Sequence, residues 1–279
     1  MIRSSHRHRA GVVAALAASA VLAVSASTSS ASAHPDGSAK PPLPAVRPTV
    51  VLVHGAWADS GSWDGVVRRL QRDGYYVDVF PTPLRSLWGD SGALRDYLAA
   101  ISGPIVLVGH SYGGAVVTDA ATGDTNVKVL VYIDAFAPDE GQTVLALPGP
   151  SSALADPSVF DLVPAGPPTP TTDFYVKQSV FPAAFANDLP PSRGAVLAAT
   201  QRPVTFAALT QASTAPAWRT IPSWYEIGTI DKIIPPSVQR SMAESIGAHI
   251  RTARTGHLPM VSDPGAVTDT IERAADSAS

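Results

Sequence analysis

The stretch VLVGHSYGGAVV, residues 106–117, decides how the chain is organised. Its first half is an apolar run typical of a buried strand, and its second half resembles a helix of small apolar residues. Ser111 lies at the junction, with Gly109 two positions before it and Gly113 two positions after it. Such a G-x-S-x-G turn needs small flanking residues and presents the serine at a helix N-terminus, where negative charge is stabilised. A glycine-serine turn can also be purely structural, so the remaining chain has to decide.

Apolar runs and helical patterns alternate on both sides of this stretch. The expected strands are residues 49–55, 75–81, 104–110, 127–135, 223–228 and 249–253. The expected helices are residues 62–74, 90–102, 111–122, 235–247 and 263–275. This alternation predicts an α/β fold with a mostly parallel sheet flanked by helices. Sites in such sheets form beyond the carboxyl ends of the strands, so His54, Ser111 and Asp134 should lie along one edge.

Residues 136–220 interrupt the alternation. They are rich in proline and alanine, with weak helical patterns at 172–181, 184–189, 192–200 and 205–213. An insertion of this length is not expected to lack structure in a compact domain. We therefore expect a mostly helical cap over the carboxyl edge of the sheet, with residues 49–135 and 221–279 forming the core.

The N-terminus has the layout of a secretory signal peptide. Three arginines precede an apolar run at 11–24, and the small residues Ala31-Ser32-Ala33 follow. This run is shorter than the roughly 20 residues that span a bilayer. We expect residues 1–33 to be a signal peptide cleaved after Ala33, which predicts a secreted protein with a proline-rich lead-in at 34–48. No membrane span is expected in the mature chain.

Composition excludes several function classes. The chain has 279 residues, no cysteine and a formal net charge of −3. Without cysteine, disulfides and thiol chemistry are impossible. The absence of a basic patch argues against a nucleic-acid partner. Nothing in the sequence indicates the oligomeric state.

A nucleophilic serine needs a base, and His257 is the best candidate. The histidines after the signal peptide are His34, His54, His110, His249 and His257. Among them, His257 lies on a loop between the last expected strand and the last expected helix, where this order of elements places a catalytic histidine. The chemistry also requires an acid that orients the imidazole. Asp231 follows the strand at 223–228 and is favoured, and Asp134, after the preceding strand, is the competitor.

An acyl-transfer site also requires two N–H donors for the developing oxyanion. The backbone N–H of Tyr112 directly follows the nucleophile. The second donor should come from the first loop, HGAWADSGSW, with Ala56 as the candidate and Trp57 as the alternative.

The segments VLVHGAW, GHSYGG, GTIDKIIP and TGHLPM occur in this order and resemble the alpha/beta-hydrolase superfamily. The resemblance covers residues 49–275, and HGAW followed by SW is similar to the serine esterase branch of plant methyl-ester esterases, hydroxynitrile lyases and bacterial homologues. It implies that Ala56 donates to the oxyanion. The related lyases carry a threonine and a lysine where this chain has Gly55 and Leu258, so the resemblance implies hydrolysis and not lyase chemistry.

These observations predict a serine hydrolase that cleaves a small, neutral or hydrophobic carboxylic ester through an acyl-enzyme, without a metal or cofactor. Lactonase and cofactor-free haloperoxidase activities use the same triad and stay open. A hydrolase-fold ligand-binding protein without turnover is the alternative outside enzymes. The aromatic residues expected to line the substrate pocket are Trp57, Phe136, Tyr175, Phe181, Phe185 and Trp218.

Overall fold

The computed structural model describes residues 47–278, which lie within one compact unit spanning 44–279. The predicted signal peptide at 1–33, its cleavage after Ala33 and nearly all of the lead-in at 34–48 fall outside the described residues. Among the helices of residues 47–278, none is long and apolar enough to cross a membrane.

The core is a six-stranded sheet in which every neighbouring pair is parallel, with strand order β2-β1-β3-β4-β8-β9. Its strands are β1 (Thr49–Val53), β2 (Tyr76–Phe80), β3 (Ile105–His110), β4 (Val127–Ile133), β8 (Ser223–Gly228) and β9 (His249–Ala253). Each falls within a predicted strand range, and the predicted parallel α/β sheet is confirmed.

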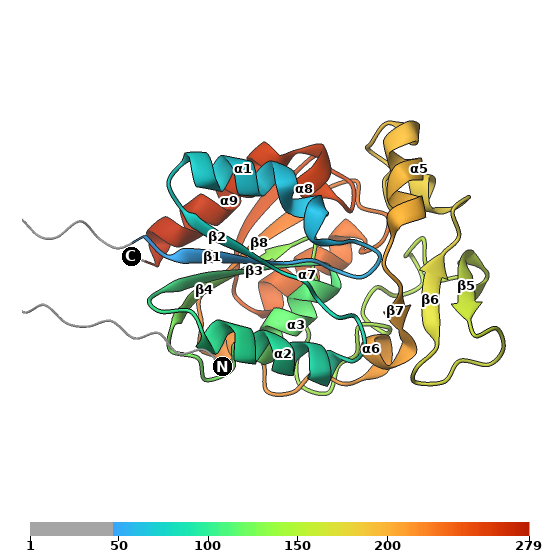
Figure 1. Cartoon of the computed structure of the whole chain (residues 1–279), viewed down its shortest axis with the longest axis horizontal. Coiled ribbons are helices and arrows are strands. Elements are labelled where there is room, and N and C mark those ends of the chain that lie inside the picture. Colours follow the sequence, from blue (N-terminus) through green and yellow to red (C-terminus); the bar gives the residue numbers. More distant parts are fainter. Residues whose placement is uncertain (1–46, 279) are drawn as a thin grey trace, which may run out of the picture. The chain divides into compact units, whose positions relative to one another are not determined.

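Helices cover both faces of the sheet (Figure 1). Helices α1 and α9 pack together on one face, and α2 and α3 pack together on the other. The core helices are α1 (Asp64–Arg72), α2 (Leu87–Ala99), α3 (Tyr112–Ala120), α7 (Pro236–Ser245), α8 (Pro259–Ser262) and α9 (Pro264–Ser277), with a short 3-10 helix η1 (Ser60–Trp63). The short α8 is the one helix among them that was not predicted.

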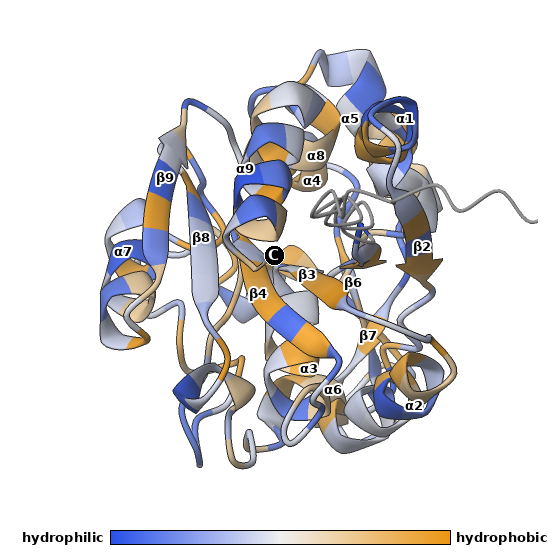
Figure 2. Ribbon diagram, turned by 90° about the vertical axis from the view of Figure 1, so that its left-hand side faces the viewer, coloured by the Kyte–Doolittle hydropathy of each residue, from blue (hydrophilic) through white to orange (hydrophobic). Residues whose placement is uncertain are grey.

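The central strands are apolar because helices bury them on both sides. Every residue of β3 is buried, as are the last four residues of β1. Figure 2 shows β3 and β4 largely in the hydrophobic colour. Continuous apolar runs of this kind are typical of parallel strands inside an α/β fold. Burial on both faces fixes the strand ends, and with them the loops that carry the candidate site.

The insertion at 136–220 differs in part from the expectation of a mostly helical cap. It contains the short helices α4 (Phe181–Ala184), α5 (Pro191–Thr200) and α6 (Phe206–Thr210), and the 3-10 helices η2 (Pro157–Val159) and η3 (Ala217–Arg219). It also contains a three-stranded antiparallel sheet of β5 (Phe160–Val163), β6 (Asp173–Val176) and β7 (Val204–Thr205). The weak helical pattern at 172–181 was misleading, because aromatic and β-branched residues at 174–176 favour a strand once partners are available. Figure 1 shows this sheet beside the core, next to α5 and α6.

Candidate active site

Ser111 occupies a strained turn between β3 and α3. Its φ is 51° and its ψ is −123°, a conformation that residues with a side chain rarely adopt. The flanking glycines permit the turn: a Cβ on Gly113 would lie 2.5 Å from the Val53 carbonyl oxygen, and one on Gly109 would lie 2.7 Å from the Gly113 carbonyl oxygen. The close approach expected from the sequence is therefore present, and it presents the Ser111 hydroxyl at the N-terminus of α3.

His257 lies on the loop between β9 and α8, and its ring reaches Ser111. The distance from His257 Nε2 to Ser111 Oγ is 2.9 Å, and both residues are buried. The neighbouring His110 ring donates from Nε2 to the backbone carbonyl of His257, at 2.7 Å, so His110 holds the backbone of the loop. Burial lowers the pKa of His110 well below its ordinary value, which keeps this second imidazole neutral. The geometry allows His257 to accept the serine proton.

Asp231, on the loop after β8, completes a chain of hydrogen bonds. His257 Nδ1 lies 2.8 Å from Asp231 Oδ2. The other carboxylate oxygen accepts the N–H groups of Ile233 and Ile234, at 2.7 and 3.2 Å. Gln239 donates to Oδ2 through its side-chain amide, at 2.7 Å. Sequence reasoning missed Gln239, because a glutamine on an amphipathic helix carries no local signal of this contact.

The competing carboxylate, Asp134, does not bond to the imidazole. It is fully buried, has a φ of 41°, and accepts the N–H of Gly228. Burial raises the pKa of Asp134 well above its ordinary value, and the nearby Asp231 raises it further. The surroundings of Asp134 therefore favour its protonated form, whereas Asp231 accepts three hydrogen bonds from backbone and amide N–H groups in addition to that of His257.

The first loop brings Ala56 and Trp57 to the same place. Ala56 is buried and lines a pocket together with Ser111 and Tyr112. Among residues 47–278, the Ala56 N–H has no hydrogen-bond partner. The N–H of Tyr112, at the first position of α3, has no acceptor within its own helix. Two backbone donors are thus available beside Ser111.

The Trp57 N–H is engaged elsewhere. It donates to the Arg202 carbonyl at 3.1 Å, and the indole donates to the Phe174 carbonyl at 2.8 Å. These bonds hold Trp57 at a φ of 57°. The alternative of Trp57 as the second oxyanion donor therefore does not agree with this geometry, which favours Ala56.

His54 has a local role in this loop. Its Nδ1 lies 2.9 Å from the Gly55 carbonyl, and its Nε2 lies 3.3 Å from the Arg202 guanidinium. Burial lowers the pKa of His54 to about 4, and the Arg202 charge contributes in the same direction. A neutral imidazole can accept from the guanidinium at Nε2 while donating to the carbonyl from Nδ1.

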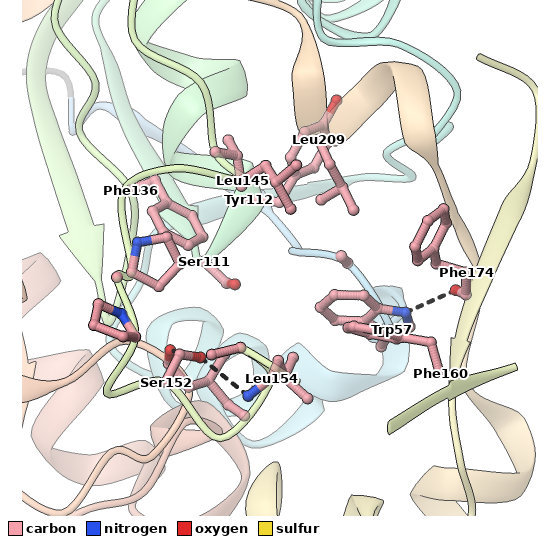
Figure 3. Close-up of a pocket in the computed structure, with 17 residues that line it drawn as sticks. Trp57, Ser111, Tyr112, Phe136, Leu145, Ser152, Leu154, Phe160, Phe174 and Leu209 are labelled. Atoms are coloured by element: carbon pink, nitrogen blue, oxygen red, sulfur yellow. Dashed lines mark hydrogen bonds between the residues drawn. The ribbon is translucent and has the colours of Figure 1, made fainter. Parts of the chain in front are cut away.

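A pocket of about 420 Å³ opens in front of Ser111. Figure 3 shows the Ser111 hydroxyl pointing into the space between Phe136 and the group of Trp57, Phe160 and Phe174. The lining residues are Ala56, Trp57, Ser111, Tyr112, Phe136, Val144, Leu145, Pro148, Gly149, Pro150, Ser152, Leu154, Ala155, Phe160, Phe174, Leu209 and Ile233. No charged side chain is among them. Two expected pocket residues, Trp57 and Phe136, are therefore present in the lining.

Four expected pocket residues do not line the pocket. Tyr175 lies on β6 next to Phe174, and adjacent strand residues point to opposite faces, so only Phe174 faces the pocket. Phe181 and Phe185 are buried and pack against each other, with ring centroids 4.7 Å apart. Trp218 lines a separate hollow and donates to the Pro138 carbonyl. Aromatic residues of the cap thus serve partly as its core.

One group in residues 47–278 could hold a metal ion by its chemistry. Atoms of Asp134, Asp231 and His257 lie within 4.8 Å of one another. In the structure, His257 Nδ1 bonds to Asp231. A metal ligand at that nitrogen would have to be deprotonated, whereas a hydrogen bond to a carboxylate needs its proton. The residues therefore fit a hydrogen-bonded acid-histidine pair better than a metal centre.

Comparisons with known proteins identify the family of the chain. The chain matches the model of the alpha/beta hydrolase family over residues 50–270. It is 36% identical over 111 residues to a carbendazim hydrolyzing esterase of Nocardioides sp. (strain SG-4G), a match that covers 35% of this chain and 46% of that relative. It is 27% identical over 259 residues to the alpha/beta hydrolase nvfD of Aspergillus novofumigatus, covering 84% of this chain and 98% of that relative.

A solved structure has the same fold. An extracellular alpha/beta-hydrolase from a Paenibacillus species, described as sharing homology with tobacco salicylic acid binding protein 2, has a TM-score of 0.70 and 21% identity, covering 81% of this chain and 98% of that one. The expected family and hydrolase class are confirmed, and the expectation of a carboxylic ester hydrolase is in line with these relatives. The chain belongs to the alpha/beta hydrolase family.

Proposed function

We propose that this protein is a secreted serine esterase that hydrolyses a neutral, apolar carboxylic ester through an acyl-enzyme. The observation that carries the proposal is the continuous hydrogen-bonded chain from Ser111 through His257 to Asp231, at 2.9 and 2.8 Å, with Ser111 facing an open pocket. A buried serine with a base at hydrogen-bond distance, and an acid behind that base, meets the geometric requirement for nucleophilic catalysis.

Each step follows from this arrangement. His257 Nε2 removes the proton of the Ser111 hydroxyl as Oγ attacks the ester carbonyl carbon. The N–H groups of Ala56 and Tyr112 stabilise the oxyanion, and His257 then protonates the leaving alcohol. Water, deprotonated by His257, hydrolyses the acyl-enzyme. Asp231 accepts from Nδ1 throughout and keeps the imidazole in the tautomer that can take the serine proton.

The pocket supports an uncharged substrate. None of its lining residues is Asp, Glu, Lys, Arg or His, so an ionised group on the substrate would lose hydration without gaining a partner. The Ser152 hydroxyl is already engaged, because it donates to the Ile233 carbonyl at 2.7 Å. Aromatic walls formed by Trp57, Phe160 and Phe174 favour an aryl or alkyl group.

Secretion rests on the N-terminal sequence. The arginine-rich start, the apolar run at 11–24 and the Ala31-Ser32-Ala33 site support export. The Paenibacillus hydrolase of the same fold is itself described as extracellular. Expression of the whole chain in a bacterial host that secretes proteins, followed by N-terminal sequencing of the protein in the medium, tests this. The first residue should be His34, and a protein that is retained in cells with its first residues intact refutes export.

The catalytic proposal is tested by substituting Ser111→Ala and assaying p-nitrophenyl esters together with a short panel of lactones. We expect kcat to fall by at least roughly 10³-fold. A fluorophosphonate should label the wild type at Ser111 and should not label the variant. Ser245→Ala, on the exposed face of α7, is the matched control and should behave as wild type. Wild-type rates in Ser111→Ala would overturn the proposal, and a wild type that binds esters without turnover would identify a ligand-binding protein instead.

A further inference from the structure

Two adjacent cap residues contact the loops that carry the histidine and the acid. The Asp188 carboxylate accepts the N–H of Gly256 at 2.7 Å, and the Asn187 amide donates to the Ile230 carbonyl at 3.0 Å. Gly256 directly precedes His257, and Ile230 directly precedes Asp231. One short cap segment therefore holds the backbone immediately before both members of the acid-histidine pair.

The two loops also meet each other at this place. The Ile230 N–H donates to the Thr255 carbonyl at 3.1 Å. A Cβ on Gly256 would lie 2.5 Å from Asn187 Oδ1 and 2.7 Å from Asp188 Oδ1. The cap pair thus packs so closely on the histidine loop that a side chain at position 256 would displace the Asn187 and Asp188 side chains from their present positions. This close approach explains a glycine that no turn conformation requires, since Gly256 is not among the glycines with positive φ.

The same cap segment contacts the imidazole. Phe185 is completely buried, and its ring meets the His257 ring edge-on, with centroids 4.8 Å apart at 78°. Phe185 restricts the rotation of the His257 ring, while Asn187 and Asp188 restrict its backbone. None of the three residues lines the pocket in front of Ser111.

We propose that Asn187 and Asp188 are positioning residues for the acid-histidine pair, so that the cap holds the catalytic base as well as enclosing the substrate. The inference rests on the proposed function, in which His257 is the base and Asp231 orients it. A catalytic group has to be held within a fraction of an ångström of its productive position, and supporting hydrogen bonds supply that precision. Loss of the support should slow the chemical step and leave substrate binding unchanged, because the pocket lining is intact.

The experiment compares Asp188→Ala, Asn187→Ala and Asp188→Asn with the wild type. We expect each alanine variant to lower kcat by roughly 10- to 100-fold at an unchanged KM, and to slow fluorophosphonate labelling of Ser111 by a similar factor. Asp188→Asn should recover most of the rate, because an amide oxygen can still accept the Gly256 N–H. The fraction of folded protein is measured by circular dichroism, so that lost activity is counted per folded molecule.

Asp119→Ala is the matched control. The Asp119 carboxylate, on α3, also accepts a backbone N–H across the boundary between core and cap, from Thr214 at 3.2 Å. That bond does not touch either catalytic loop, so Asp119→Ala should lower stability and leave kcat per folded molecule unchanged.

The outcomes separate the two levels of the proposal. An inactive, unlabelled wild type would refute the proposed function. An active wild type whose alanine variants keep wild-type kcat, or lose it no more than Asp119→Ala does, would overturn the positioning role. If Asp188→Ala does not fold, Asn187→Ala and Asp188→Asn decide the question by the same criteria.

Discussion

Replacing Glu226 with glutamine should make the stability of this protein less dependent on pH. Glu226 lies on β8 and is 1% exposed. One carboxyl oxygen accepts the hydroxyl proton of Thr270, and the other has no partner among residues 47–278. Burial raises the pKa of Glu226 from 4.5 to about 7, opposed in part by the Thr270 hydrogen bond and by the charge of Arg251.

The magnitude follows from this shift. Raising the pKa from 4.5 to about 7 corresponds to about 3 kcal/mol at 1.36 kcal/mol per unit. Below pH 4.5 the carboxyl group is protonated in both the folded and the unfolded state, and the full stability is present. As the pH rises through the range from 4.5 to about 7, the unfolded state loses its proton first, so folding becomes less favourable. Above that range the whole contribution of about 3 kcal/mol has been lost.

Urea denaturation of the wild type and Glu226→Gln at pH 4.5 and pH 8 measures this loss. The difference in unfolding free energy between variant and wild type should change by about 3 kcal/mol in favour of the variant at the higher pH. Subtracting the wild type from the variant at each pH removes the titration of the other groups. Comparing the two pH values then removes the fixed cost of placing an amide in the site. A difference that stays constant within about 0.5 kcal/mol between the two pH values would refute the reasoning. In Thr270→Val, which loses the hydrogen-bond donor, the loss of stability should continue to a higher pH.

Three further predictions concern the candidate site. Asp231→Asn should lower kcat by roughly 10³- to 10⁴-fold. Asp134→Asn should keep kcat within about threefold, because Asp134 does not bond to the imidazole and burial already favours its uncharged form. Equal losses in an ester assay would contradict the assignment of the acid. Gly113→Ala should lower the unfolding free energy and abolish fluorophosphonate labelling of Ser111, because the added Cβ would lie 2.5 Å from the Val53 carbonyl oxygen. A variant with normal thermal unfolding and normal labelling would disprove the close approach. Phe174→Asp should raise KM for uncharged aryl esters at least tenfold by placing a charge in the apolar pocket, and an unchanged KM would show that the ester binds elsewhere.

The candidate nucleophile and base could be predicted from local sequence. Strand and helix patterns repeat over a few residues, so the alternation around Ser111 already indicates a parallel sheet, and the turn between Gly109 and Gly113 indicates where a serine is presented. His257 is predicted because it lies on a loop beyond the last strand. These predictions depend on local patterns and on their order along the chain, and in the structure the Ser111 and His257 side chains lie 2.9 Å apart.

The cap was less predictable, because its short elements are stabilised by tertiary contacts. Residues 173–176 form a strand that pairs with β5 on one side and with β7 on the other. Whether Phe174 or Tyr175 faces the pocket depends on that register, since neighbouring strand residues point in opposite directions. No periodicity in so short a segment could distinguish the two.

The sequence by itself predicted the parallel fold, the turn at Ser111 and the loop of His257, because each depends on local patterns and on their order along the chain. The sequence favoured Asp231 over Asp134, but only the tertiary structure shows that Asp231, and not Asp134, bonds to the imidazole, because both follow strands at the same edge. Tertiary structure also brought Asn187 and Asp188 onto the loops that carry Asp231 and His257, across more than 40 residues of chain in one contact and more than 60 in the other. Contacts of that span depend on how the whole cap packs, and no local pattern encodes them.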